Sequence, residues 1–325
     1  MVRFLLGILL TAALAAGALA QTKSFTVMLI MFRGATPAEQ GFTDYLKSRL
    51  PVRFIMHDAN GARAKVKEFV AEAKSQRVDL IYTFGTSVTL DTVGALNKTD
   101  PDIHAVDIPV VFNIVADPVG AGLASAWAAT GRNLTGVSHL VPMPDQLRAM
   151  ERFGKVRKLG VIYNSLEANS LLAVEQLRQH ADQFQYELIE APLRSGQRPD
   201  DSEIGEAMRR LIESKPDFVY LPSDSSLIER ASAIIGPATA ARVPVISATE
   251  GPIRQDGALM GLVSNYANAG AFAGYKAEQI LLGKTPVERI PIETLQRFTL
   301  VVNMKTAVQL GVYPPLDLIK IAELL

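Results

Sequence analysis

The sequence predicts an α/β protein made of two Rossmann-like lobes, each a parallel sheet covered by helices. Short apolar runs such as residues 25–31 and 158–164 lack the polar alternation of a half-exposed strand, and amphipathic stretches separate them. This alternation of strand and helix occurs in two series. Residues 131–157, which contain several Gly and Pro, interrupt it and suit a crossing between lobes. The interruption disfavours the alternative of a single (β/α)8 barrel.

The first series follows residue 21. Its expected strands are residues 25–31, 52–56, 79–85 and 109–117, and its expected helices include residues 36–50 and 87–98. Thr36-Pro37 is typical of a helix start. Between these helices, apolar residues recur from Val66 to Ala73 at the spacing i, i+3, i+4 and i+7, which predicts one face of a further helix.

The second series begins near Lys158. Its expected strands are residues 158–164, 186–193, 217–224 and 243–249, and its expected helices are residues 170–185, 202–214 and 227–241. Late extended segments between Pro291 and Met304 indicate that the chain crosses between the lobes more than once.

Composition excludes several classes of function. The 325 residues carry 33 Lys and Arg against 33 Asp and Glu, so net charge favours neither nucleic acid nor an anionic membrane surface. The absence of Cys excludes disulfides, thiolate catalysis and Cys-ligated metals. The dinucleotide fingerprint, the nucleophile elbow and paired zinc-binding histidines are also missing. We therefore expect no cofactor, no metal and no enzyme activity, with an exported enzyme that uses dispersed carboxylates as an open alternative.

Residues 1–20 have the pattern of a cleaved signal peptide. Arg3 precedes an uncharged stretch that ends in Ala18-Leu19-Ala20. A membrane anchor is disfavoured, because the stretch is rich in Ala and Gly and shorter than the roughly 20 strongly apolar residues that span a bilayer. We expect an exported, soluble, periplasmic protein without a lipid anchor, since no Cys is available to carry one.

Polar side chains follow the predicted strands, at the edge where open parallel sheets bind ligands. The candidate ligand-binding residues are Phe32, Arg33, Thr86, Ser87, Asp117, Asn164, Asn169, Ser170, Ser223, Asp224, Glu250 and Tyr266. Helix N-termini suit a ligand carboxylate. Asp224 or Glu250 could bind an ammonium group, and Phe32 or Tyr266 could cover an apolar side chain. These residues predict a site for an amino acid or a similar zwitterion. Each assignment has a structural alternative to ligand binding. The hydroxyl residues could cap helices, Asp117 could begin a turn, and Arg33 could be a solvated loop residue.

Several strings carry a family resemblance, in order along nearly the whole chain. They are DPVGAGL at 117–123, NLTGVS at 133–138, GVIYN at 160–164 with EANS at 167–170, PSD at 222–224, and LVVNMKTA at 300–307 with LGV at 310–312. With these strings the chain resembles the substrate-binding proteins of ABC importers. The similar group has the type-I periplasmic-binding fold and includes binders of tryptophan and other aromatic amino acids.

The resemblance implies two lobes joined by a three-crossover hinge, with a small solute bound between them. It implies a first lobe of residues 21–138 plus 264–292 and a second of residues 139–263 plus 293–325. The implied protein is a monomer that closes on its solute and docks on an ABC permease in the inner membrane; a sensory receptor is the alternative partner.

The chain departs from the family pattern at two loops. Phe32 to Thr36 replaces a segment that usually contains His-Pro, and Glu250 stands where relatives often have Asp. Both loops lie where the ligand side chain would be selected. Arg33 could there meet a second acidic group on the ligand.

Overall fold

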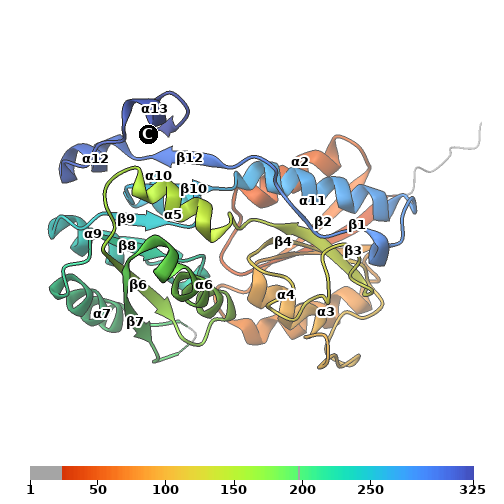
Figure 1. The fold of residues 1–325 in the computed structure, drawn as a ribbon. Helices are drawn as coiled ribbons and strands as arrows, with labels where there is room; N and C mark the ends of the chain where they lie inside the picture. Colours follow the sequence, from red (N-terminus) through yellow and green to blue (C-terminus); the bar gives the residue numbers. More distant parts are fainter. Residues whose placement is uncertain (1–23, 197) are drawn as a thin grey trace, which may run out of the picture.

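The computed structural model describes residues 24–196 and 198–325, which form two lobes (Figure 1). The expected signal peptide, residues 1–20, lies outside the described residues. Each lobe has its own sheet, so the two-lobe prediction is confirmed and the single-barrel alternative is wrong.

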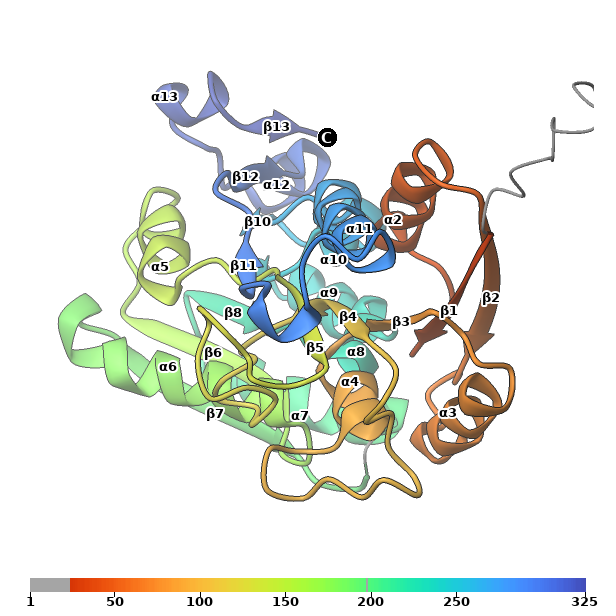
Figure 2. The same ribbon diagram turned by 90° about the vertical axis from the view of Figure 1, so that its right-hand side faces the viewer.

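The first lobe is built on six parallel strands in the order β11-β5-β4-β3-β1-β2. The strands are β1 (Phe25–Met31), β2 (Val52–Asp58), β3 (Leu80–Phe84), β4 (Val110–Val115), β5 (Leu134–Ser138) and β11 (Glu293–Thr294). Helices α2 (Pro37–Lys47) and α11 (Tyr266–Leu281) cover one face, and α3 (Val66–Ser75) and α4 (Thr86–Val93) cover the other (Figure 2). Two short 3-10 turns, η1 (Arg63–Lys65) and η2 (Val287–Arg289), complete the lobe.

Helix α11 returns to the first lobe late in the chain and packs closely on α2. A Cβ atom on Gly41 would lie 2.1 Å from the Ala267 carbonyl oxygen, and one on Gly270 would lie 1.9 Å from that of Ala38. No side chain fits at either position. The two glycines therefore let the helix backbones touch, which fixes the returning segment on the first sheet.

The second lobe is a sheet of seven strands in the order β13-β12-β10-β9-β8-β6-β7, in which only β10 and β12 pair antiparallel. Its strands are β6 (Lys158–Asn164), β7 (Glu187–Leu193), β8 (Phe218–Leu221), β9 (Val245–Ser247), β10 (Met260–Val263), β12 (Thr299–Val302) and β13 (Glu323–Leu324). Its helices are α5 (Met143–Glu151), α6 (Ala168–Phe184), α7 (Asp201–Glu213), α8 (Ser225–Ile228), α9 (Ala231–Ala240), α10 (Glu250–Gln255), α12 (Met304–Leu310) and α13 (Leu316–Ile319).

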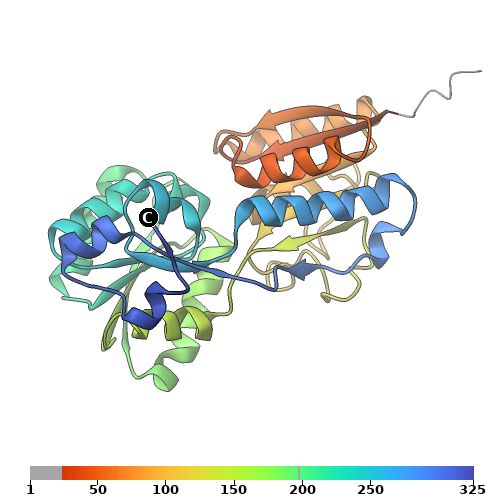
Figure 3. The same cartoon turned by 90° about the horizontal axis from the view of Figure 1, so that it is seen from above.

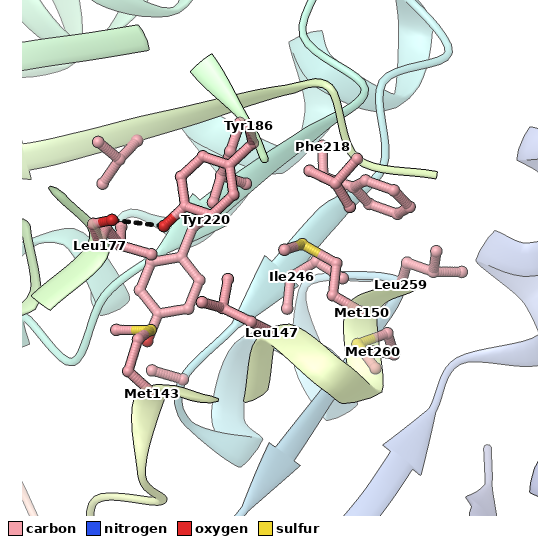
Figure 4. Packing of buried hydrophobic residues seen from close by; sticks show 14 of the residues in the cluster. Met143, Leu147, Met150, Leu177, Tyr186, Phe218, Tyr220, Ile246, Leu259 and Met260 are labelled. Carbon is pink, nitrogen blue, oxygen red and sulfur yellow. Dashed lines mark hydrogen bonds between the residues drawn. The ribbon is translucent and has the colours of Figure 1, made fainter. Parts of the chain in front are cut away.

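Both faces of the second sheet are buried. On one face, Met143, Leu147 and Met150 of α5 pack around Tyr220 of β8, and Tyr186 donates a hydrogen bond to the Leu177 carbonyl (Figure 4). On the other face, α7, α9 and α10 supply the core. Burial on both faces explains why these strands read as unbroken apolar runs.

The chain passes between the lobes three times (Figure 3). Crossover 1 is residues 139–142, between β5 and α5, and crossover 2 is residues 264–265, between β10 and α11. Crossover 3 is residues 295–298, between β11 and β12. Since β11 pairs with β5 in the first sheet, the passage lies later than the expected boundary between residues 292 and 293. A hydrogen bond joins crossovers 1 and 2: the Ser264 hydroxyl donates to the His139 carbonyl at 2.7 Å.

Three local expectations need correction. Residues 131–157 are not merely a connection, since they include β5 and α5. The strand signal was weak because β5 contains Gly136, whose Cβ would lie 2.3 Å from the Phe112 carbonyl oxygen. The helix expected over 87–98 ends at Val93, before Gly94 with φ of 71°. The helix expected over 227–241 is divided into α8 and α9.

Candidate functional site between the lobes

The C-terminal ends of the parallel strands of both lobes meet at a cleft. A cavity of about 540 Å³ lies there, and we call it the interlobe cavity. Arg33 and Thr36 line it from the first lobe, Thr249 and Glu250 line it from the second, and Tyr266 lines it beside crossover 2. Strand ends of this kind are the usual ligand position in open α/β sheets.

Aromatic rings gather next to the interlobe cavity. Tyr266 meets Phe84 edge to face with ring centroids 6.2 Å apart, and it meets His139 in the same way at 6.0 Å. The guanidinium carbon of Arg33 lies 5.9 Å from the Phe84 ring centroid. Such a surface suits an apolar or aromatic side chain.

Two buried polar atoms between the lobes, Arg33 Nε and Asn169 Oδ1, have no hydrogen-bond partner among the described residues. His139 and Thr249 lie there too, but His139 bonds to the Val115 backbone and Thr249 to the Tyr266 side chain. Buried polar atoms in proteins almost always have a partner. Because Arg33 belongs to the first lobe and Asn169 to the second, a polar molecule held in the cleft could bond to both lobes at once.

The cleft narrows next to α4, where a contact joins the two lobes directly. Ser87 donates a hydrogen bond of 2.7 Å to Glu167 at the start of α6. Phe32, Thr86 and Asn169 line the same narrow region, whose free volume is only about 10 Å³. Burial raises the pKa of Glu167, and the Ser87 bond opposes that rise.

His139 connects crossover 1 to the second lobe. Its Nε2 is 2.8 Å from Ser223 Oγ, and only 1% of the residue is exposed. Burial, which disfavours the charged ring, lowers the pKa of His139 to about 4, and the positive charge of Arg33 acts in the same direction. The imidazole is therefore neutral at pH 7, and one ring nitrogen can donate while the other accepts.

Glu250 faces the interlobe cavity but is already paired. Its Oε1 accepts from the Tyr266 backbone NH at 3.0 Å, and its Oε2 accepts from Arg254 Nε at 3.1 Å. Arg254 is shared with Glu323, at 2.7 and 2.9 Å. Nearby, burial raises the pKa of Asp256.

Three other predicted residues are bound inside the second lobe. The Ser170 hydroxyl donates to Asp224 Oδ2 at 2.6 Å, while Asp224 Oδ1 accepts from the backbone NH groups of Ser226 and Leu227 and so caps α8. Asn164 Oδ1 accepts from the Leu166 NH at 2.9 Å. These side chains hold the strand-end loops in shape.

Asp117 lies at a second cavity, of about 580 Å³, next to crossovers 1 and 3. Its Oδ1 accepts from the backbone NH groups of Val119 and Gly120. The structure thus places Arg33, Glu250 and Tyr266 at the interlobe cavity, and Phe32, Thr86, Ser87 and Asn169 at the narrow region. Ser223 is positioned through His139 and through its carbonyl, which accepts from Asn169.

His139, Thr36 and Thr249 are not among the residues predicted to bind the ligand, although Thr36 ends the first-lobe loop predicted to select the ligand side chain. Thr249 directly precedes Glu250 after a strand, so the strand-end rule could have included it. His139 gave no such signal, because only the tertiary structure shows that crossover 1 runs beside the cleft.

Within residues 24–196 and 198–325, no group of three or more His, Cys, Asp or Glu is arranged to hold a metal ion. Over the same ranges, the helices are all too short or too polar to cross a membrane.

Comparison with known proteins decides the family. The family model for ABC transporter substrate binding proteins matches residues 38–324. The chain belongs to this family. The family resemblance inferred from the sequence motifs is therefore confirmed. The expectation of a solute-binding protein that is not an enzyme agrees with the family and its relatives.

One curated relative and two solved structures are similar to this chain. The substrate-binding protein is 29% identical to a tyrosine-binding protein of Clostridioides difficile (strain R20291), over 82% of this chain and 72% of that protein. A Streptococcus pneumoniae domain solved in complex with L-Trp has a TM-score of 0.80 and 22% identity, covering 92% of this chain and 100% of that one. A conserved domain protein from Vibrio cholerae O1 biovar El Tor has a TM-score of 0.83 and 24% identity, covering 93% and 99%. These two structures have the same fold.

Proposed function

We propose that this substrate-binding protein binds an amino acid with an aromatic or other apolar side chain in the interlobe cleft, and delivers it to an ABC permease. The observation that carries the proposal is the pair of unpartnered polar atoms Arg33 Nε and Asn169 Oδ1, one from each lobe. Arg33 lines the interlobe cavity, and Asn169 lines the narrow region of the same cleft. The interlobe cavity is large enough for an amino acid and has aromatic rings beside it.

Closure of the two lobes would make the complex recognisable to the permease. Three short crossovers join the lobes, and Ser87 and Glu167 already bond across the cleft. A ligand that bonds to both lobes favours the closed arrangement, because it binds that arrangement more tightly than an open one. In this proposal the protein acts as a monomer in the periplasm of an importing cell, after removal of residues 1–20.

The relatives narrow the class of ligand. One is named as a tyrosine-binding protein, and another was solved with L-Trp. In this chain the rings of Phe84, Tyr266 and His139 lie beside the interlobe cavity. L-Tyrosine and L-tryptophan are therefore the first ligands to test.

A thermal-shift screen of residues 21–325 with the twenty amino acids tests the proposal. A ligand at 100 times its Kd stabilises the folded state by about 2.7 kcal/mol, which corresponds to a rise in Tm of about 5 °C or more. We expect L-tyrosine or L-tryptophan to give such a rise, with glucose and myo-inositol as control solutes that give none. Recovery of the bound amino acid chemically unchanged after long incubation is the expected sign of a binding protein. If no amino acid raises Tm, the proposal is wrong.

A further inference from the structure

Arg33 is held at the edge of the interlobe cavity by a fixed loop. The loop follows β1, and Gly34, with φ of 68°, donates its backbone NH to Asp58 Oδ2 at 2.8 Å. Asp58 Oδ1 accepts from the Asn60 backbone NH at 2.7 Å. The nearby carboxylate therefore bonds to backbone groups and is not the partner of the Arg33 guanidinium.

The other arginine in the lining of the cavity, Arg254, bonds to Glu250 and Glu323. Arg198 lies outside the lining and bonds at 2.7 Å to Glu229, which is part of it. Arg33 contacts the Phe84 ring, and its buried Nε has no hydrogen-bond partner among the described residues. A partly buried guanidinium without an anion is costly, and a carboxylate placed in a low-dielectric cleft would bond to it strongly.

The N-terminus of α4, a second position that suits a carboxylate, is already used. The N-terminus of α4 points into the narrow region, but Glu167 of the second lobe occupies that place through its bond to Ser87. Within residues 24–196 and 198–325, Arg33 is therefore the one cationic residue that lines the interlobe cavity without a carboxylate partner. On the second-lobe wall, Arg254 is shared by Glu250 and Glu323, and Asp256 has no ion pair among the described residues. This wall therefore carries a net negative charge, which would repel a further acidic group and attract an ammonium.

Building on the proposed function, we infer that Arg33 binds the carboxylate of the ligand and thereby selects a monocarboxylic amino acid over its amide, its amine and dicarboxylic amino acids. The planar guanidinium matches a carboxylate with two parallel hydrogen bonds, which an amide cannot form with the same charge. The ligand carboxylate then faces the first lobe, and its ammonium group faces the carboxylates of the second lobe.

Calorimetric titration of variants against matched ligands tests the inference. The probes are L-tyrosine, L-tryptophan, the amides of both, and L-glutamate; the variants are Arg33→Gln, Arg33→Lys and the control Arg53→Gln on β2. We expect Arg33→Gln to weaken binding of the two amino acids by about 10- to 100-fold and to change binding of their amides by less than about threefold. Arg33→Lys should restore part of the loss, and Arg53→Gln should bind like the wild type. L-Glutamate should not bind.

The contrary outcomes separate the two proposals. Wild-type protein that binds neither aromatic amino acid overturns the proposed function, and the role of Arg33 with it. If the wild type binds them and Arg33→Gln binds them equally well, only the role of Arg33 is overturned. The role of Arg33 is also overturned if Arg33→Gln weakens the affinity for the amino acid and for its amide by equal factors. It is likewise overturned if L-glutamate binds more tightly than L-tyrosine.

Discussion

The polar loops of the two lobes face the same cleft but differ in how their side chains are bonded. In the second lobe, Ser170 bonds to Asp224, and Glu250 bonds to Arg254 and to the Tyr266 backbone. In the first lobe, Arg33 has no carboxylate partner, and Ser87 bonds only across the cleft, to Glu167. Residues of similar type at similar strand ends therefore have different roles. Those with partners in their own lobe maintain its shape, and those without are available to a ligand or to the other lobe.

The largest expected effect is the loss of stability on replacing Asp224, a residue of the loops whose side chains bond within their own lobe. Asp224→Ala removes the acceptor for two backbone NH groups and for the hydroxyls of Ser170 and Ser226, all within a buried loop. We expect a loss of about 4 kcal/mol in the free energy of unfolding, measured by urea denaturation. Asp200→Ala is the matched control, because Asp200 caps α7 at an exposed site, and it should cost about 1 kcal/mol. Equal losses in the two variants would remove the distinction between the loops.

The next effect concerns pH and His139. In the folded protein its pKa is lowered to about 4 from the ordinary 6.5, so between these values the unfolded chain binds a proton that the folded chain does not. The stability contribution is therefore fully present above pH 6.5 and is lost as the pH falls towards 4. The loss amounts to about 3 kcal/mol, at about 1.4 kcal/mol for each pKa unit.

Denaturation of wild type and His139→Asn from pH 7.5 to pH 4 measures this loss. Other groups also titrate in the range, so the quantity compared is the difference between the two proteins. The wild type should lose about 3 kcal/mol more than His139→Asn over this interval. His180→Asn, on the surface helix α6, should follow the wild type. Parallel curves for wild type and His139→Asn would contradict the buried, neutral state of the ring.

The smallest expected effect concerns the contact across the cleft. Ser87→Ala removes the hydrogen bond to Glu167. If the proposed function holds, it should weaken binding of L-tyrosine about fivefold, or about 1 kcal/mol, because the proposed closed arrangement loses one bond. Ser165→Ala is the control, since its hydroxyl donates to the Leu193 carbonyl within the second lobe. Titration calorimetry on both variants measures the difference. An unchanged affinity in Ser87→Ala would show that this contact does not contribute to closure.

Much of the fold was predictable because buried parallel strands have a direct signature. The runs at 25–31 and 158–164 are β1 and β6 with the same boundaries as expected. The failures have local causes. Strand β5 contains Gly136, which gives no strand signal, although close approach to Phe112 requires it. Helix α11 lies within the segment that the resemblance placed in the first lobe, and Gly270 packs it on α2, a contact between segments far apart in sequence.

For the candidate site, the strand-end rule found Arg33, Glu250 and Tyr266 at one cavity. It could not separate them from Asn164, Ser170 and Asp224, whose side chains bond within the second lobe. Both sets have residue types that bind ligands and cap helices equally well. The choice between these roles depends on the neighbours of each side chain, which are remote in the chain.

The amino-acid sequence by itself determined the two-lobe α/β fold, because hydrophobic periodicity and strand length are local properties of the chain. It also determined the family, through strings that lie in order along its length. The tertiary structure alone decided which polar residues lack partners, and it brought His139 beside Tyr266 and Ser223. The physical reason is that a hydrogen bond or an ion pair depends on distances of a few ångströms between segments separated by many residues, and only the folded chain sets those distances.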